Sequence, residues 1–157
     1  PLDGVNQIRN CQALFHAVGL GMFVGTALPA YLAEALLFAG RTTDALAAVE
    51  EGLAFAESHG HRYFEPELLR VRGEIAFADG HTGEAASWYR RALERARQQS
   101  SRAHELKAAL SLSNVLVREG RSNEAHAVVQ AVHGSFVDGF ETADLRRARE
   151  LLRARTS

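Results

Sequence analysis

Apolar residues recur along most of this chain at the spacing of one face of an α-helix. Near its start, Ile8, Cys11, Leu14, Phe15 and Val18 follow one another at such intervals, which places their side chains on one side of a helix. No segment shows the strict alternation of apolar and polar residues expected of a half-buried strand. The pattern therefore predicts an all-α protein of about seven helices.

The expected helices succeed one another with short interruptions. A first helix over residues 4–18 is followed by three glycines that loosen the chain, and then by a helix over residues 29–39 that Pro29 can either start or kink. Further helices are predicted over residues 43–58, 64–79, 83–98, 102–119 and 123–133. After an irregular stretch, Thr142 is placed to cap a final helix over residues 142–154.

One short phrase occurs three times at a fixed interval. It reads Gly-Arg-Thr-Thr-Asp-Ala at residues 40–45, Gly-His-Thr-Gly-Glu-Ala at 80–85 and Gly-Arg-Ser-Asn-Glu-Ala at 120–125. We expect each glycine to end one helix in a left-handed conformation, and the Ser or Thr two residues later to cap the next helix. The forty-residue spacing of Gly40, Gly80 and Gly120 indicates a stack of helical repeats.

Small residues occupy two fixed positions relative to each glycine. Seven residues before the turns stand Ala33, Gly73 and Ser113, and five residues after them stand Ala45, Ala85 and Ala125. Nine residues after the turns stand the larger Val49, Tyr89 and Val129. Small side chains allow the two helices of a pair to approach closely, and the larger ones are expected to fill the space between successive pairs.

This combination of small residues, a glycine turn, an acidic residue with alanine and a bulky apolar group resembles the tetratricopeptide repeat family. The resemblance covers almost the whole chain and implies a single domain over residues 1–157, an α-α superhelix of antiparallel helix pairs closed by the final helix. The chain departs from the family in its longer period, since that family repeats about every 34 residues. In this frame, residues 1–18 are the second helix of a truncated preceding repeat.

A narrower resemblance rests on the order of several phrases. They are Leu-Pro-Ala-Tyr-Leu-Ala-Glu-Ala (28–35), Pro-Glu-Leu-Leu-Arg-Val-Arg-Gly-Glu (66–74), Ala-Arg-Gln-Gln (96–99), His-Glu-Leu-Lys-Ala-Ala-Leu-Ser-Leu (104–112) and Phe-Val-Asp-Gly-Phe-Glu-Thr-Ala-Asp-Leu (136–145). Together they are similar to the C-terminal repeat region of bacterial multidomain signalling proteins, which carry a cyclase-like, ATPase or DNA-binding domain upstream. The resemblance implies a fragment of such a protein.

Composition narrows the partners and the compartment. The net charge is −1 at neutral pH, so the whole chain exerts no marked attraction on nucleic acid or anionic membrane. Cys11 is the only cysteine, which excludes an internal disulfide and fits a reducing compartment. We expect a cytoplasmic protein in which Cys11 fills space in the core.

No set of residues predicts catalysis. The early glycines lack the lysine of a phosphate-binding loop, and His59 and His61 lack a third metal ligand. Ser100 and Ser101 are interpreted as helix N-caps. Five arginines of the final helix (Arg146, Arg147, Arg149, Arg153 and Arg155) suit a polar cap over the end of the stack better than a DNA-binding surface. The sequence therefore predicts no enzyme, no metal and no cofactor.

The candidate binding surface is the concave groove that the first helix of each pair lines in tetratricopeptide arrays. The resemblance assigns to it Ala30, Glu34 and Leu37 in the first such helix, Glu67, Arg70, Glu74 and Phe77 in the second, and Lys107, Leu110, Asn114, Val117 and Arg118 in the third. Mixed charge beside exposed apolar groups suits a peptide or a protein helix. The alternative is that Arg70 and Glu74, four residues apart, simply pair with each other on a solvated surface.

Three functions remain open at this point. The first is a regulatory or protein-interaction scaffold whose partner is a protein or peptide, including the parent's own upstream domains, with no nucleic acid or membrane involved. The second is an effector-sensing superhelical domain of a transcription activator, which a deep pocket would favour over an open groove. The third, an enzyme, has no residues to support it.

Overall fold

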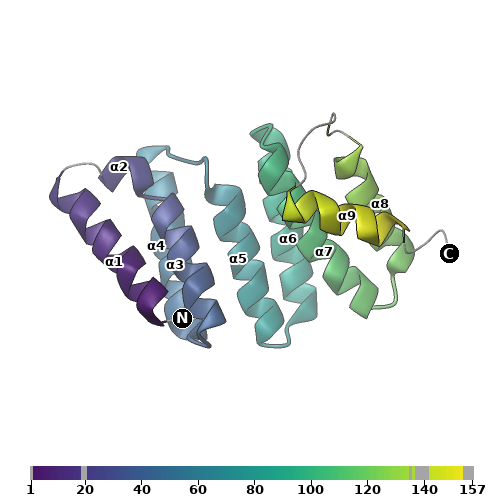
Figure 1. Cartoon of the computed structure of the whole chain (residues 1–157), viewed down its shortest axis with the longest axis horizontal. Coiled ribbons are helices and arrows are strands. Elements are labelled where there is room, and N and C mark those ends of the chain that lie inside the picture. The colour runs from purple at the N-terminus through teal and green to yellow at the C-terminus, as the bar shows by residue number, and fades with distance from the viewer. Residues whose placement is uncertain (1, 19–20, 135, 137–141, 154–157) are drawn as a thin grey trace.

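The computed structural model describes residues 2–18, 21–134, 136 and 142–153, and these residues form helices and no strand (Figure 1). The helices are α1 (Leu2–Ala17), α2 (Gly21–Val24), α3 (Ala27–Phe38), α4 (Thr42–His59), α5 (Glu65–Ala78), α6 (Thr82–Gln98), α7 (Arg102–Arg118), α8 (Ser122–His133) and α9 (Ala143–Arg153). The all-α prediction is confirmed. The expected number of about seven is too low, because nine helical segments occur in the described part of the chain, one of them the single turn α2.

Successive helices pack as pairs in one elongated row, from α1 at one end to α8 and α9 at the other (Figure 1). The pairs are α3 with α4, α5 with α6 and α7 with α8, each joined by a tight turn. The first helices of the pairs also contact one another, α3 against α5 and α5 against α7. These three helices therefore share a face. At the α7 end of this face, α9 packs on α7 and α8.

The three repeated glycines end their helices as predicted. Their φ angles are 73° at Gly40, 84° at Gly80 and 75° at Gly120, in the left-handed region that glycine adopts without a steric penalty. In each turn the amide of the residue after the glycine donates to a carbonyl five residues earlier, as in the bond from Arg41 N to Leu36 O at 2.9 Å. This bond satisfies a carbonyl that the end of the helix would otherwise leave unpaired.

The predicted side-chain caps in these turns are wrong. The helices begin at Thr42, Thr82 and Ser122 themselves, and no side chain caps the first turn. The backbone bonds of the glycine turn bring the chain into the helix one residue earlier than expected, which places the hydroxyl inside the helix. Thr142 does cap α9 as predicted, because its Oγ1 accepts a hydrogen bond from Leu145 N at 3.3 Å.

The turn between α6 and α7 also differs from the prediction. Ser100 is no N-cap but a left-handed residue with φ 54°, and its amide and that of Ser101 make the same pair of bonds to the end of α6 as the glycine turns make. Ser101 precedes α7, but its hydroxyl bonds to the ring of His104 rather than to a backbone amide.

The small residues predicted at helix contacts are buried where the helices of a pair meet. Ala33, Ala45, Ala85, Ser113 and Ala125 have no solvent exposure. The larger residues Val49, Tyr89 and Val129 are buried as well, each among residues of neighbouring helices. The helical phase read from the sequence is therefore correct over all three turns, and it fixes which faces of α3, α5 and α7 remain open.

In the part of the chain that the structure describes, no helix combines the length and the apolar character needed to cross a lipid bilayer.

Cys11 lies half-buried on α1 as a free thiol. The helices carry their apolar residues mainly at helix contacts, with polar residues between them.

Candidate functional site

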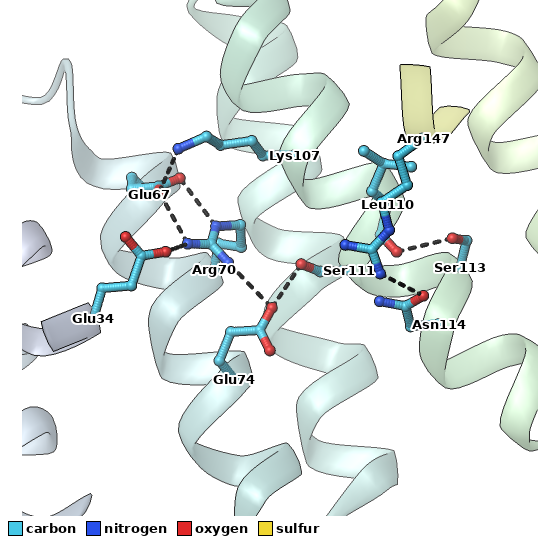
Figure 2. A network of polar contacts seen from close by, with 10 residues as sticks. All are labelled: Glu34, Glu67, Arg70, Glu74, Lys107, Leu110, Ser111, Ser113, Asn114 and Arg147. Carbon is cyan, nitrogen blue, oxygen red and sulfur yellow. Dashed lines mark hydrogen bonds and ion pairs between the residues drawn. The ribbon is translucent and has the colours of Figure 1, made fainter. Parts of the chain in front are cut away.

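The shared face of α3, α5 and α7 carries a network of charged side chains centred on Arg70 (Figure 2). Glu67, Arg70 and Glu74 stand three and four residues apart on α5, so the helix places their side chains in one row. Glu34 approaches from α3, and Lys107 and Ser111 approach from α7 (Figure 2). The three repeats thus contribute to one polar network, which we call the Arg70 network.

The guanidinium of Arg70 binds three carboxylates. Its Nε and Nη2 donate to the two oxygens of Glu67 at 3.1 and 2.9 Å, the bidentate arrangement that suits a guanidinium best. Its Nη1 donates to Glu74 Oε1 at 3.1 Å, and Nη2 also reaches Glu34 Oε1. One cation therefore holds acidic side chains of α3 and α5 together.

The carboxylates extend the network to α7. Lys107 Nζ lies 3.0 Å from Glu67 Oε1, and Ser111 Oγ donates to Glu74 Oε1 at 2.7 Å. The Arg70 network therefore joins neighbouring repeats in both directions and fixes the positions of α3, α5 and α7 relative to one another.

Burial makes the centre of the network different from an ordinary surface ion pair. The side chain of Glu67 is 3% exposed and that of Arg70 10%, whereas Glu34 and Lys107 are 49% and 38% exposed. Burial by itself would raise the pKa of Glu67, but the hydrogen bonds and charges of Arg70 and Lys107 outweigh it and leave that pKa lowered. Burial would likewise lower the pKa of Arg70, but the hydrogen bonds and charge of Glu67, together with the charges of Glu34 and Glu74, outweigh it and leave that pKa raised.

These positions correct the predicted site. Arg70 does pair with Glu74, as the alternative interpretation had it, but Arg70 is buried and Glu74 half-buried rather than fully solvated. Ala30, Glu67 and Leu110 are buried as well, at 1%, 2% and 3% exposure. Their neighbours cover these three side chains, so they lie beneath the surface of the face. A partner on the face would therefore contact little of them.

The remaining predicted residues divide between the core and the surface. Leu37 packs against the core of the α3–α4 pair. Glu34, Lys107, Asn114, Val117 and Arg118 keep exposed surface, and Phe77 lies half-buried beneath the guanidinium of Arg118, 4.5 Å from its ring centre. The accessible part of the predicted stripe is thus concentrated at Glu34 and at the α7 end of the face.

A pocket of about 730 Å³ lies at that end, where α9 crosses α7 and α8. Phe77, Val117 and Leu151 provide apolar walls, while Asn114, Arg118 and Arg147 provide polar groups. Arg147 of α9 donates to Asn114 Oδ1 at 3.1 Å (Figure 2), so the final helix is attached to the predicted binding stripe. We call this cavity the α9 pocket.

The α3 end of the face carries an apolar depression of about 540 Å³, and Glu34 is the one described residue of its lining that the predicted site included. Ile8 of α1 and Leu28, Tyr31, Ala35 and Phe38 of α3 line it together with Glu34. Phe38 is 83% exposed and Tyr31 46%. Leu28, Tyr31, Ala35 and Phe38 follow one another at helical spacing, and that signal could have identified the depression.

Within the described ranges, no group of three or more His, Cys, Asp or Glu residues is placed to hold a metal ion. His59 stacks on Phe55 with ring centres 4.1 Å apart, and His61 meets the same ring edge-on. His59 at the end of α4 and His61 in the connection to α5 therefore pack against an aromatic ring.

No family model matches the chain, and no curated protein matches it. The fold defines the class of protein, an all-α stack of helix pairs of the helical-repeat type.

Proposed function

We propose that this domain is a non-catalytic protein-interaction module that binds a helical or extended peptide segment on the α3–α5–α7 face. The observation that carries the proposal is the apolar depression on α3, where Tyr31 and Phe38 are exposed beside the accessible carboxylate of Glu34. Large apolar groups gathered at an exposed depression on a helical-repeat face are typical of a docking site.

The chemistry of the depression indicates the kind of partner. Apolar side chains of a partner would fill the space between Tyr31 and Phe38 and supply most of the binding energy. A lysine or arginine of the partner would face Glu34, whose charge is only partly compensated by Arg70, since that cation is shared among three carboxylates. The expected partner is thus an amphipathic segment with a basic residue at the edge of its apolar side.

The wider setting of the module follows from the sequence resemblance. We propose a tetratricopeptide-like regulatory scaffold at the C-terminus of a cytoplasmic bacterial signalling or transcription-regulatory protein. The arrangement of α3 to α8 as three packed helix pairs supports a repeat architecture of this kind. The segment that binds the face could then belong to the parent's own upstream domains.

The second candidate, an effector-sensing domain, is favoured by a different observation. The α9 pocket is large enough for a small molecule and is lined on several sides by residues of α5, α7, α8 and α9. A small molecule bound there would not compete directly with a segment docked on α3.

The interaction proposal can be tested with a displayed library of amphipathic peptides selected on the immobilised domain. The best peptide is then titrated against Phe38→Ala and Tyr31→Ala, each expected to weaken binding about tenfold or more while the melting temperature hardly changes. Tyr63→Ala, which truncates another exposed aromatic residue, serves as the matched control. Selected peptides that bind all three variants as tightly as the unmodified domain would show that the depression is not the docking site.

A further inference from the structure

The α9 pocket combines apolar walls with two cationic groups. Phe77 and Val117 line it from α5 and α7, and Leu151 lines it from α9. Arg118 and Arg147 reach it from α7 and α9, respectively, and no carboxylate is among the described residues that line it. The lining of the pocket is therefore mainly apolar, and its charged side chains are positive.

The two guanidinium groups differ in their partners from arginines such as Arg41, Arg70 and Arg121. Arg147 donates to the neutral amide oxygen of Asn114, and Arg118 lies over the ring of Phe77. Among the described residues, neither has a carboxylate within 4.0 Å, whereas Arg41, Arg70 and Arg121 each have one or more. Asp144, one turn before Arg147, lines the adjacent polar cavity of the Arg70 network together with Arg147, but it does not line this pocket.

We propose that the α9 pocket binds a free carboxylic acid with an apolar body, such as a medium-chain fatty acid or an aromatic acid. The carboxylate would lie between Arg118 and Arg147, whose planar donor groups match its two oxygens. The apolar body would lie against Phe77, Val117 and Leu151. A pocket of about 730 Å³ falls within the range of roughly 300 to 1,000 Å³ that small-molecule sites occupy.

Binding at this place would have a mechanical consequence. The acid would contact α5 and α7 on one side and α9 on the other, so it would add to the contacts that already hold α9, among them the bond between Arg147 and Asn114. A ligand that binds only the folded arrangement raises its stability by mass action. Occupancy should therefore strengthen the attachment of α9 to the repeats.

This inference does not depend on the proposed interaction module. The apolar depression is built by α1 and α3, and the α9 pocket by α5, α7, α8 and α9. The substitutions Phe38→Ala and Tyr31→Ala lie outside the pocket, so loss of peptide binding in those variants and loss of acid binding in the variants below are separate outcomes.

The test compares sodium decanoate with decan-1-ol, which has the same chain length and no charge, on the whole domain by isothermal titration calorimetry. We expect decanoate to bind with a dissociation constant about tenfold to a hundredfold lower than the alcohol, because charged hydrogen bonds contribute that much. Arg118→Gln with Arg147→Gln should remove most of this preference. Arg90→Gln, a change at an exposed arginine of α6 outside the pocket, should leave it intact.

A second measurement uses the unmodified domain. It is needed because Arg147→Gln removes the hydrogen bond to Asn114 as well as a positive charge of the pocket. In methyl NMR spectra of the unmodified domain, decanoate should shift the signals of Val117 and Leu151 in a saturable way and leave those of Leu14 and Val18 unchanged. Equal affinity for acid and alcohol, no saturable binding of decanoate, or shifts confined to Leu14 and Val18 would each overturn the proposal.

Discussion

Gly73 of α5 faces the ring of Tyr89 of α6 at a distance that leaves no room for a side chain. A Cβ atom at residue 73 would lie 2.5 Å from the nearest ring carbon, and the ring itself is 1% exposed and enclosed by its neighbours. Burial and the nearby carboxylate of Glu74 also raise the pKa of Tyr89 above its ordinary value of 10. The contact joins the two helices of the central pair.

Gly73→Ala should therefore destabilise the domain although alanine favours a helix more than glycine does. The added methyl group must displace a buried ring, and overpacking of this kind costs about 1 to 3 kcal/mol. Gly83→Ala is the control, since a Cβ there meets nothing within 4 Å and should stabilise α6 by about 0.4 to 1 kcal/mol. Urea denaturation measures both, and equal effects of the two changes would contradict the assigned helix contact.

The main features of the fold could be predicted because they depend on residues close together in the sequence. Gly40, Gly80 and Gly120 mark the turns, since only glycine adopts the required φ angle at no cost, and the phase of small residues then identifies the buried faces. The interpretation of Ser100 as an N-cap is wrong because no glycine marks this turn. Serine carries no sign of a left-handed conformation, although the left-handed residues Gly40, Gly60, Gly80, Ser100 and Gly120 in fact recur every twenty residues.

Ser100→Gly should stabilise the domain by about 1 kcal/mol, because a left-handed backbone costs a residue with a side chain roughly 1 to 2 kcal/mol. The gain is reduced by the greater flexibility of glycine in the unfolded chain. Gly80→Ala makes the reverse change in an equivalent turn and should destabilise by a similar amount. Melting temperatures of the two variants should thus move in opposite directions, and a lower value for Ser100→Gly would refute the explanation of this turn.

The candidate site could be predicted only in part, because its burial depends on residues distant in the sequence. The spacing of Arg70 and Glu74 on one helix indicates their pairing. It does not show that Glu34, 36 residues earlier, and Lys107, 40 residues after Glu67, complete the Arg70 network. Nor can the spacing show that α9 packs on α7, where Arg147 donates a hydrogen bond to Asn114.

Arg70→Met should destabilise the domain strongly, by about 3 to 5 kcal/mol, because it leaves the carboxylate of Glu67 buried with Lys107 as its remaining cationic partner. Combining it with Glu67→Met should recover much of the loss, since the uncompensated buried charge is then removed as well. Arg90→Met, at an exposed arginine, should change stability by no more than about 0.5 kcal/mol. Chemical denaturation of the single and double variants forms the test. A double variant that loses as much as the sum of the single changes would argue against a coupled network.

His104 should make the stability of the domain depend on pH near neutrality. Its ring is buried between Tyr63 and Phe64 and bonds to Ser101. Burial, together with the charges of Lys107 and Arg70, lowers its pKa below the ordinary value of 6.5, and the opposing charge of Glu67 does not compensate. The unfolded chain therefore binds a proton at a higher pH than the folded one does, and the stabilising contribution is complete above pH 6.5 and decreases as the pH falls below it.

Two variants separate this effect from the titration of acidic groups. His104→Phe keeps an aromatic ring in the same place and should flatten the stability profile below pH 6.5. His81→Gln, at an exposed histidine, is the matched control. Glu67, whose pKa is lowered in the folded state, should cause a separate loss of stability only below its ordinary value of 4.5. Urea midpoints measured from pH 8 to pH 4 provide the comparison. A profile for His104→Phe that falls as steeply as that of the unmodified domain would mean that His104 is not the group responsible.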